Sequence, residues 1–593
     1  MSAVNQVRNY DVVVVGSGAG GLAAAVTAAH HGCRVAVVEK APVLGGATSW
    51  SGGWAWTPGT SFAKKDGVIE EKDQFRTYLK SVIGERYQAE NVDAFLDAAP
   101  EMVDFFENNT QLQFTPGAAI NDIYGNLPGA GTGHRSVGPK PFNGRKIRKE
   151  VREKLRHQYY ETSFLGMGIM AGPDLMKFLS ASQFSPSGWV HAARRFLVHL
   201  WDLAIHRRNM QMVNGIALTG RLAASADDLG VELLTSTEAL SLDTDPETGR
   251  ITGVRVRGAD GVELLTATRG VVLATGGFPN NVELRKDLFP RTPTGQEHWT
   301  LSPAETVGDG LTMAQEVGAA FEKDLASPAA WCPVSRVPFL NGKTGTFPHI
   351  MDRAKPGSIG VVSTGKRFVN EANGYHDYVT AMLEAAPEGE PVESWQIADS
   401  TFVRKYPLGM AKPLPVPLTP YLRSGYLIKG DTIEELAEKC GIDPAGLAQT
   451  VRDFNNNAKK GIDPEFHRGE TPFNRYGGDK KTAPNPSLAP IEKGPFYAVK
   501  VLPGSFGTFA GIAADGRSRV LREDKTPIEG LYTAGNDRAS IMGGFYPAGG
   551  INLGPALTFG YIAGCELAGV SEDAGAGAVE FENAAVSAAS REG

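Results

Sequence analysis

Residues 535–564, GNDRASIMGGFYPAGGINLGPALTFGYIAG, combine the residue types most suited to binding and chemistry. The first half holds too much glycine and proline to be helical throughout, so it predicts a tight loop, followed by a helix from about Pro555. Such a loop brings backbone N–H groups close to a bound group. Tyr546 is a large polar side chain in the part of the loop, residues 541–551, that is otherwise apolar. The Tyr546 hydroxyl and the Gly550 N–H are two donors that can stabilise charge building on a carbonyl oxygen.

The elements that would position this loop begin at the N-terminus. Tyr10–Val15 is a short run rich in valine, typical of a strand buried on both faces of a parallel sheet. The glycine-rich run 16–21, GSGAGG, follows directly, and then an alanine-rich segment predicts a helix that ends at Gly32. A second strand is expected over Arg34–Val38, closed by Glu39. This is a βαβ unit with the dinucleotide fingerprint GxGxxG, in which Glu39 is placed to bind ribose hydroxyls.

The fingerprint by itself does not choose between NAD and FAD, and a glycine loop without a ligand has the same spacing. The strand before it, the helix after it and Glu39 favour a bound dinucleotide. Three further glycine-rich pieces favour FAD: Gly45–Gly53, the strand and turn Gly270–Phe278, and the strand Gly530–Gly535 that leads into the loop of Tyr546.

Composition sets the broad class. The 593 residues are 42% hydrophobic and 21% charged, which is ordinary for a globular protein of two or three structural units. A net charge of -7 gives no reason to expect a nucleic-acid partner. Four widely spaced cysteines form no CxxC pair, so a reduced compartment is expected and a metal site is not. The N-terminal residues lack an apolar signal core, and no apolar run reaches a membrane span, which predicts a cytoplasmic protein.

One helix leaves two alternatives open. Residues 191–208, HAARRFLVHLWDLAIHRR, have apolar side chains at helical spacing and basic flanks. Such a helix can lie on a membrane surface as a peripheral contact. More often it packs on its own domain or on a partner subunit.

The ordered set of glycine motifs resembles the fumarate reductase/succinate dehydrogenase flavoprotein superfamily, and the resemblance covers most of the chain. It implies an α/β fold: a Rossmann-like FAD-binding domain of the GR2 type with a parallel sheet, and an inserted α+β substrate-capping domain. We expect the first domain to comprise residues 1–333 and 507–593 and the capping domain to comprise residues 334–506.

The polar residues of the capping domain separate this chain from the fumarate-reducing members. In those members a stretch similar to Arg367–Glu371, RFVNE, precedes an arginine that donates a proton, and here that position is Tyr375. They also carry an arginine before the LG pair of the C-terminal loop, where this chain has Asn552. An arginine suits a dicarboxylate substrate, whereas a tyrosine suits a neutral ketone.

Within the superfamily the chain resembles the 3-ketosteroid Δ1-dehydrogenases. Their C-terminal signature is similar to residues 546–550, YPAGG, although Ala548 stands where they often carry glycine. Their capping-domain tyrosine matches Tyr375, and a third tyrosine matches Tyr124. The resemblance implies that Tyr546 and Gly550 bind the ketone oxygen, that Tyr375 with help from Tyr124 removes the α-proton, and that the β-hydrogen leaves as hydride to flavin N5.

The same resemblance implies a set of FAD-binding residues. They are Gly16, Gly18, Ala19, Gly20, Gly21, Glu39, Lys40, Gly46, Ala47, Thr48, Ser51, Gly52, Gly53, Ala239, Ala274, Thr275, Gly276, Gly277, Gly535, Asn536 and Leu553. Some relatives attach FAD through a histidine in the segment matching Gly45–Gly53, and this chain has none there. We therefore expect non-covalent FAD.

The expected function is desaturation of a small apolar ketone, a 3-ketosteroid first, to the α,β-unsaturated ketone. The alternatives are a smaller cyclohexanone-type ketone, reduction of an enone or unsaturated acid, and a flavin-bound protein with a structural or sensing role. Only one dinucleotide fingerprint is visible in the sequence, so the electron acceptor is expected to be a quinone or another protein.

Overall fold

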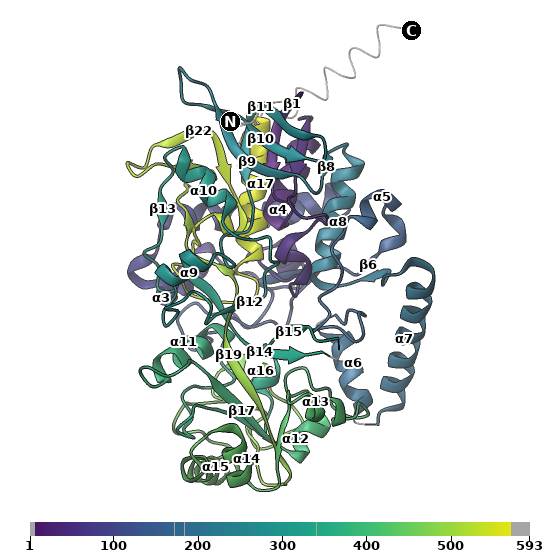
Figure 1. Cartoon of the computed structure of the whole chain (residues 1–593), viewed down its shortest axis with the longest axis vertical. Coiled ribbons are helices and arrows are strands. Elements are labelled where there is room, and N and C mark those ends of the chain that lie inside the picture. Colours follow the sequence, from purple (N-terminus) through teal and green to yellow (C-terminus); the bar gives the residue numbers. More distant parts are fainter. Residues whose placement is uncertain (1–5, 171, 183, 340, 571–593) are drawn as a thin grey trace.

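The structure is a computed structural model that describes residues 6–170, 172–182, 184–339 and 341–570. An eight-stranded sheet lies in the upper half of the molecule (Figure 1). Its parallel part has the strand order β22–β11–β1–β2–β8. Antiparallel β21 pairs with β22 at one edge, and antiparallel β10, which pairs with β9, branches from β11. The strands are β1 (Gln6–Val15), β2 (Val35–Val38), β8 (Glu232–Leu234), β9 (Glu238–Thr244), β10 (Ile251–Gly258), β11 (Gly261–Leu273), β21 (Arg519–Leu521) and β22 (Pro527–Thr533). The valines at the end of β1 are buried because helices and loops cover both faces of the sheet.

Two helices from opposite ends of the sequence pack side by side against this sheet. They are α1 (Ala19–His30), directly after the glycine loop, and α17 (Leu553–Ala568), drawn in yellow in Figure 1. Their backbones approach closely, since a side chain at Gly560 would lie 2.3 Å from the carbonyl oxygen of Gly20. The packing places the C-terminal loop of Tyr546 against the N-terminal nucleotide unit.

A seven-stranded sheet forms the centre of the lower half, with the order β15–β14–β19–β17–β16. Its strands are β12 (Trp299–Thr300), β14 (Ala329–Pro338), β15 (Thr344–Pro348), β16 (Ser358–Val361), β17 (Ser394–Asp399), β18 (Ile428–Gly430) and β19 (Phe496–Thr508). The long strands β14 and β19 carry the chain into and out of this half, and the expected domain boundaries at 333 and 507 fall inside them. The division into two domains at these residues stays a prediction.

The remaining elements are short strands and helices around the two sheets. The strands are β3 (Ala55–Trp56), β4 (Phe114–Pro116), β5 (Ser136–Pro139), β6 (Phe142–Asn143), β7 (Gln211–Met212), β13 (Phe321–Glu322) and β20 (Gly511–Ile512). The helices are α2 (Ser61–Lys65), α3 (Lys72–Ile83), α4 (Ala89–Asn109), α5 (Lys149–Glu153), α6 (Pro173–Ser182), α7 (Pro186–His206), α8 (Asn214–Asp228), α9 (Val282–Leu288), α10 (Asp309–Glu316), α11 (Tyr375–Ala385), α12 (Ser400–Lys405), α13 (Thr419–Arg423), α14 (Ile433–Cys440), α15 (Pro444–Ala458) and α16 (Pro472–Gly477).

The sequence pattern over residues 231–240 predicts one strand, and that prediction is wrong. The structure has β8 and β9 with a break at Thr235–Thr237. Ser236 has a positive φ of 53°, and its N–H donates to the carbonyl of Ala41. Because the chain bonds here to the loop after β2, it leaves the parallel sheet and re-enters as an antiparallel strand.

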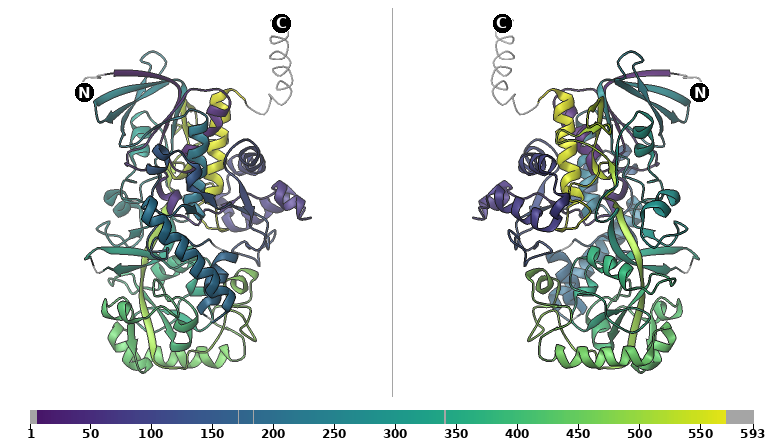
Figure 2. Two further views of the ribbon diagram at one scale, coloured as in Figure 1. Left: turned by 90° about the vertical axis from the view of Figure 1, so that its right-hand side faces the viewer. Right: turned by 90° about the vertical axis from the view of Figure 1, so that its left-hand side faces the viewer.

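Helices α6 and α7 form a hairpin at the edge of the molecule (Figures 1 and 2). The helix expected over residues 191–208 is α7, which begins earlier, at Pro186, and ends at His206. Within the described residues, no helix has the length and hydrophobicity required to span a membrane.

Candidate functional site

The structure brings Tyr375 and Tyr546 together, although they come from different halves of the molecule. Tyr375 is the first residue of α11, and Tyr546 lies in the loop between β22 and α17. Their ring centroids are 4.9 Å apart in an edge-to-face arrangement. Phe506 of β19 packs edge-on against Tyr375 at 5.3 Å. The pair therefore lies in an aromatic, largely apolar surrounding.

Both hydroxyls are held in the neutral form. Burial raises the pKa of Tyr375 well above its ordinary value, and the nearby charge and hydrogen bond of Tyr546 raise it further. Burial also raises the pKa of Tyr546, while the neighbouring Tyr375 hydroxyl lowers it. The Tyr546 hydroxyl thus keeps a proton that it can donate to a ligand.

A buried ion cluster fixes the segment that ends at Tyr375. Glu371 accepts hydrogen bonds from Arg367 at 2.9 and 2.8 Å and from Arg468 at 3.0 Å. Burial alone would raise the pKa of Glu371, but the two guanidinium groups outweigh it and lower the pKa to about 2. Arg367 also pairs with Asp463. The RFVNE stretch therefore acts as an anchor, four residues before Tyr375.

The loop that carries Tyr546 is held by the N-terminal half of the chain. The Tyr78 hydroxyl donates to the carbonyl of Pro547 at 2.6 Å, and the Ile123 N–H donates to the same oxygen at 2.9 Å. Ser136 donates to the carbonyl of Gly549 at 3.2 Å. These bonds tie the loop to segments from the N-terminal half of the chain.

Gly550 has the geometry expected of a backbone donor. Its carbonyl accepts the N–H groups of Trp56 at 3.0 Å and Gly554 at 2.8 Å. Its own N–H donates to none of the described residues. Gly550 has a φ of +102°, and a side chain there would lie 2.7 Å from the Trp56 nitrogen, so the position requires glycine.

Tyr124, the third expected tyrosine, lies in the loop between β4 and β5. Its hydroxyl donates to Asp377 at 2.6 Å, and its N–H reaches the Tyr78 oxygen at 3.4 Å. Burial raises the pKa of Tyr124, and the charge of Asp377 raises it further. The preceding residue, Ile123, lies against Gly374, next to Tyr375. Tyr124 therefore sits at the N-terminal end of α11, where Tyr375 begins.

Sequence reasoning treated His376 as structural or substrate-lining and did not single out Asp377, although both residues follow Tyr375 directly. His376 accepts the Trp331 N–H at 3.2 Å and hydrogen-bonds the backbone of Gly544, and burial lowers its pKa to about 3. Its ring lies 6.0 Å from that of Tyr546. Asp377 is buried, and this burial raises its pKa to about 6 although Tyr124 and Arg353 counteract the rise. No spacing in the sequence marks either residue, because their partners come from distant segments.

The glycine loop after β1 has the backbone of a phosphate site. Gly16 has a φ of +109°, and a side chain there would lie 2.1 Å from the carbonyl oxygen of Ala274. Helix α1 has no acidic residue in its first turn and no side-chain cap at Gly18, which leaves its positive end suited to an anion. Thr48 reaches this end and accepts the Ala19 N–H at 3.0 Å. Glu39 accepts the Ser17 N–H at 3.2 Å, so it closes the loop.

A second buried carboxylate organises the turn after β11. Asp537 accepts the Thr275 hydroxyl and the Gly277 N–H, each at 2.8 Å. Burial raises the pKa of Asp537, and these bonds lower it. The sequence did not single out Asp537, which follows Gly535 and Asn536 directly. Asp537 therefore links the turn at residues 273–277, LATGG, to the segment that follows β22.

The chain matches a known protein family over most of its length. Residues 11–553 match the model of the FAD binding domain family, which is most of the chain. The chain belongs to this FAD-binding family. It is a FAD-dependent oxidoreductase of the dehydrogenase type, with the fold of the fumarate reductase flavoproteins.

Relatives of known activity align along nearly the full length. The chain is 41% identical to the 4-oxocyclohex-2-ene-1-carboxylate 5-dehydrogenase of Sinomonas cyclohexanicum, over 95% of this chain and 94% of that one. It is 38% identical to a 3-oxosteroid 1-dehydrogenase of Mycolicibacterium smegmatis, over 95% and 97%. The structure of a 3-ketosteroid Δ1-dehydrogenase of Sterolibacterium denitrificans, in complex with 1,4-androstadiene-3,17-dione, superposes with a TM-score of 0.87 at 35% identity, covering 95% and 100%.

The residues of this FAD-binding chain fit the cofactor. Beside Gly18, Gly46 and Gly535, an added side-chain carbon would meet nothing closer than 3.6 Å, although the three glycines are at most partly exposed. Their backbones thus line free space next to the positive end of α1. Elsewhere in the unit glycines are needed for packing, as at Gly53, where a side chain would lie 2.7 Å from Asn214. The free space lies where the pyrophosphate of a dinucleotide would meet the helix.

Two other expected cofactor residues make contacts within the expected FAD-binding domain. Lys40 pairs with Asp309 at 3.1 Å and Glu238 at 3.4 Å, next to Ala239 of β9. Ser51 donates to the Thr48 carbonyl at 2.7 Å and holds the 46–53 segment in shape. Contacts of FAD with each residue of the expected set, and its non-covalent binding, stay predictions.

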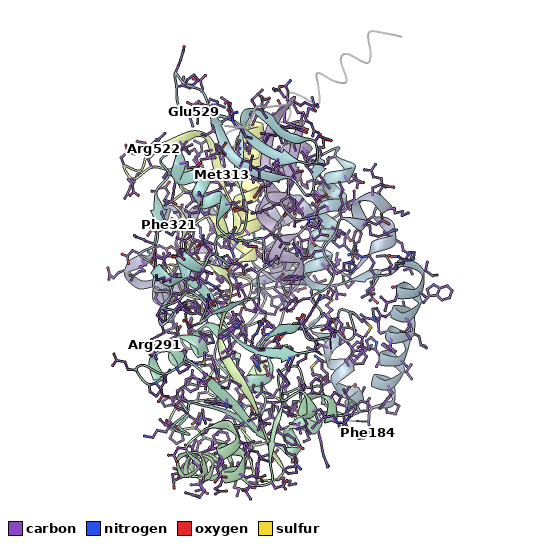
Figure 3. The ribbon with its side chains drawn as sticks, viewed as in Figure 1. Phe184, Arg291, Met313, Phe321, Arg522 and Glu529 are labelled. Atoms are coloured by element: carbon purple, nitrogen blue, oxygen red, sulfur yellow. The ribbon has the colours of Figure 1, made fainter. Side chains whose placement is uncertain are left out.

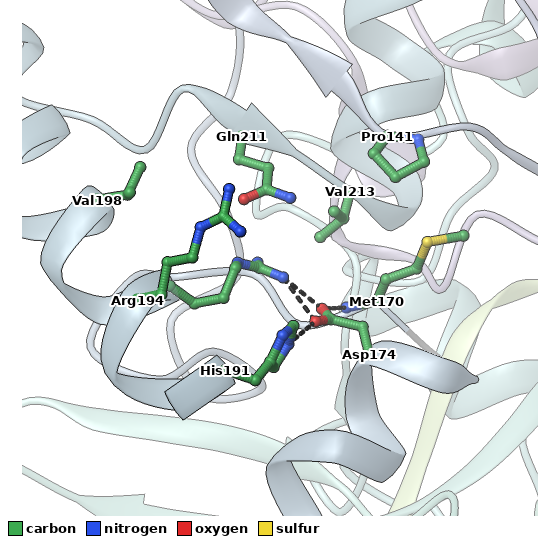
Figure 4. A pocket seen from close by; sticks show the side chains of 9 residues that line it. Pro141, Met170, Asp174, His191, Arg194, Val198, Gln211 and Val213 are labelled. Atoms are coloured by element: carbon green, nitrogen blue, oxygen red, sulfur yellow. Dashed lines mark hydrogen bonds and ion pairs between the residues drawn. The ribbon is translucent and has the colours of Figure 1, made fainter. Parts of the chain in front are cut away.

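A separate pocket of about 400 Å³ lies between α6, α7 and β7 (Figure 4). On one side Asp174 pairs with His191 and Arg195, and Arg194 faces the pocket near Gln211. Its lining includes neither tyrosine of the site. The described residues hold no cluster of metal-ligating side chains, and the four cysteines are free thiols.

Proposed function

We propose that this enzyme desaturates a cyclic ketone, a 3-ketosteroid first, to the α,β-unsaturated ketone. The observation that carries the proposal is the contact between Tyr375 and Tyr546, together with a Gly550 N–H in the same loop that donates to none of the described residues. Two donors next to a buried aromatic wall suit a neutral carbonyl oxygen rather than a carboxylate. The relatives named as 3-oxosteroid dehydrogenases support the substrate class.

The mechanism assigns each residue of the site a role. The Tyr546 hydroxyl and the Gly550 N–H bind the ketone oxygen and stabilise the charge that builds on it as the α-proton leaves. Tyr375, aided by Tyr124, takes that proton as general base. FAD held at the glycine loop 16–21 would supply the chemistry that takes up the β-hydrogen as hydride. Phe506 and the buried rings around Tyr546 exclude water from the enolate.

A second substrate class has its own support. The relative that is 41% identical acts, by its name, on a cyclohexenone that carries a carboxylate. Arg353 is the cation that affects the pKa of Tyr375, and its guanidinium already donates to the carbonyls of His349 and Glu371. A carboxylate would therefore need a cation beyond this neighbourhood, and the neutral steroid remains the first candidate.

The test is a substrate panel with the purified holoenzyme and an artificial electron acceptor. We expect turnover with a 3-ketosteroid saturated at C1–C2, and none when fumarate is supplied with reduced viologen. Turnover of 4-oxocyclohexenecarboxylate alone would move the function to the smaller ring. A lack of turnover and of flavin bleaching with every ketone would refute the proposal.

A peripheral membrane contact is proposed for the α6–α7 hairpin. Helix α7 buries polar side chains and exposes apolar ones. His199 and Asp202 are buried. The side chains of Leu197, Trp201 and Ile205 are 66%, 63% and 53% exposed. Phe184, at the turn of the hairpin, projects outward and is 72% exposed (Figure 3). The outward stripe, at i, i+4 and i+8, is the pattern of a helix that lies in a bilayer interface.

The charges of the hairpin favour an anionic lipid surface over a protein partner. Its two acids are engaged inward, Asp174 with Arg195 and Asp202 with Arg145, while Lys177, Arg194 and Arg207 form none of the ion pairs recorded in the described part of the chain. Basic residues beside an exposed apolar stripe match negative headgroups.

Sedimentation with vesicles tests this contact. Binding is expected to phosphatidylglycerol-containing vesicles and less to pure phosphatidylcholine. It should fall with Trp201→Glu but not with Ile69→Glu, a control at a side chain that is even more exposed. A protein that ignores vesicles and is a dimer dissociated by Trp201→Glu would show that a second copy covers the stripe.

A further inference from the structure

The three tyrosines of the site create a problem for proton removal. Burial raises the pKa of Tyr375, Tyr546 and Tyr124, so each is a neutral phenol near pH 7. A neutral phenol accepts a proton only as it gives up its own. The site therefore requires a base that stands behind the tyrosines and can hold the proton after it leaves the ketone.

Asp377 is the carboxylate in contact with one of these hydroxyls. It receives the Tyr124 O–H at 2.6 Å, a short distance typical of a hydrogen bond to an ionised carboxylate. Its second oxygen, Oδ2, is buried and has no well-formed hydrogen bond, with only the Gly374 backbone near it. A carboxylate with one oxygen unsatisfied in a buried place gains by accepting a proton.

The titratable groups that face Asp377 come from three different segments. Tyr124 contacts it directly, Tyr78 of α3 lies within electrostatic range, and Arg353 approaches from the segment after β15. Arg353 and the bond from Tyr124 hold the anion, while burial disfavours it, and the pKa is raised to about 6. Asp377 is thus ionised at neutral pH yet close to protonation, which suits a general base.

We propose that Asp377 is the terminal proton acceptor of the dehydrogenation, acting through Tyr124 at the N-terminal end of α11. This rests on the proposed function. In the step, the α C–H bond of the ketone breaks and its electron pair forms the enolate held by Tyr546 and Gly550. The α-proton forms a new O–H bond on Tyr375 as the old Tyr375 O–H bond breaks. The proton released from Tyr375 bonds to the Tyr124 oxygen as the old Tyr124 O–H bond breaks, and the proton released from Tyr124 forms a new O–H bond on Asp377 Oδ1. One proton leaves carbon and one arrives on the carboxylate.

A purely structural role has to be separated from this one. Asp377 is the third residue of α11, and its carboxylate reaches back toward the Gly374 N–H as in a helix cap. Asp377→Asn keeps one oxygen that can accept the Tyr124 hydroxyl and removes the ability to take a proton, while its amide group replaces the oxygen nearest Gly374. A capping role predicts a stability change alone, whereas the proposal predicts a change in rate and in its pH dependence.

The experiment compares pH profiles of the holoenzyme with a ketosteroid whose turnover by the wild type is first established. Asp377→Asn should lower kcat by about 10²-fold or more, with KM within a few-fold and the flavin spectrum retained. The acid limb of the wild-type profile should vanish in the variant. Tyr124→Phe should give a similar loss, and the double variant little more, because the two act as one unit.

The chain provides a matched control in its second tyrosine–aspartate pair. Tyr406 donates to Asp479 at 2.5 Å in the lower half of the molecule. Asp479→Asn should leave the rate and the pH profile unchanged. An active wild type whose acid limb survives in both Asp377→Asn and Tyr124→Phe would overturn the role of Asp377 while leaving the proposed function intact. If Asp377→Asn fails to fold, the Tyr124→Phe profile decides alone.

Discussion

Gly550 allows the oxyanion site to be tested through the backbone. In Gly550→Ala the new side-chain carbon would lie 2.7 Å from the Trp56 nitrogen and 2.8 Å from the Trp54 oxygen. Both are backbone atoms, so the loop has to move. The residue also keeps a φ of +102°, where a side chain costs about 1–2 kcal/mol. Displacing one donor of an oxyanion site lowers kcat by about 10²–10³-fold.

The neighbouring Gly549 is the control. An added carbon there meets nothing within 4 Å, and its backbone is not left-handed. The thermal unfolding temperature should therefore fall for Gly550→Ala and stay unchanged for Gly549→Ala. Steady-state turnover of a ketosteroid should drop by at least about tenfold in the first variant, as the partial loss of one donor. Folded Gly550→Ala with kcat within twofold of the wild type would refute the donor role of Gly550.

Three further predictions concern Tyr546, Glu371 and bound FAD. Tyr546→Phe keeps its ring contacts and should retain stability while kcat falls by about 10²-fold, measured by steady-state turnover. Glu371→Gln leaves Arg367 and Arg468 without their shared anion and should cost about 3–5 kcal/mol in denaturant unfolding. Because the folded pKa of Glu371 is lowered to about 2 from 4.5, its contribution is present above pH 4.5 and is lost as pH falls towards 2, and the variant should lack this acid-dependent part. Removing FAD should lower the unfolding free energy by about 4 kcal/mol if the free cofactor is a thousandfold above its Kd, read as a drop in Tm.

The sequence pattern predicted those parts of the fold whose signals are local. Strand β1, helix α1 and strand β2 follow from valine runs and glycine spacing, and they lie within a few residues of the expected bounds. Helix α17 begins at Leu553, two residues before the expected Pro555. The contact of Tyr375 with Tyr546 was reached from motif context, since each motif has a fixed place in the family fold.

Contacts between distant segments could not be predicted in this way. Asp377 meets Tyr124 across 253 residues of sequence, and Asp537 meets Thr275 across 262. A lone aspartate carries no periodicity, so its burial and partner emerge only from the tertiary packing. The same reason explains the break between β8 and β9, where a bond from Ser236 to Ala41 overrides the local strand pattern.

Anaerobic mixing of the oxidised holoenzyme with a 3-ketosteroid, followed by the flavin absorbance in a single turnover, tests the central claim most directly. The wild type should lose its yellow absorbance and form one equivalent of the Δ1-unsaturated ketone, and Tyr375→Phe should bleach at least about 10²-fold more slowly. Bleaching at an unchanged rate in Tyr375→Phe and Tyr546→Phe would contradict the claim that these two hydroxyls carry out the chemistry.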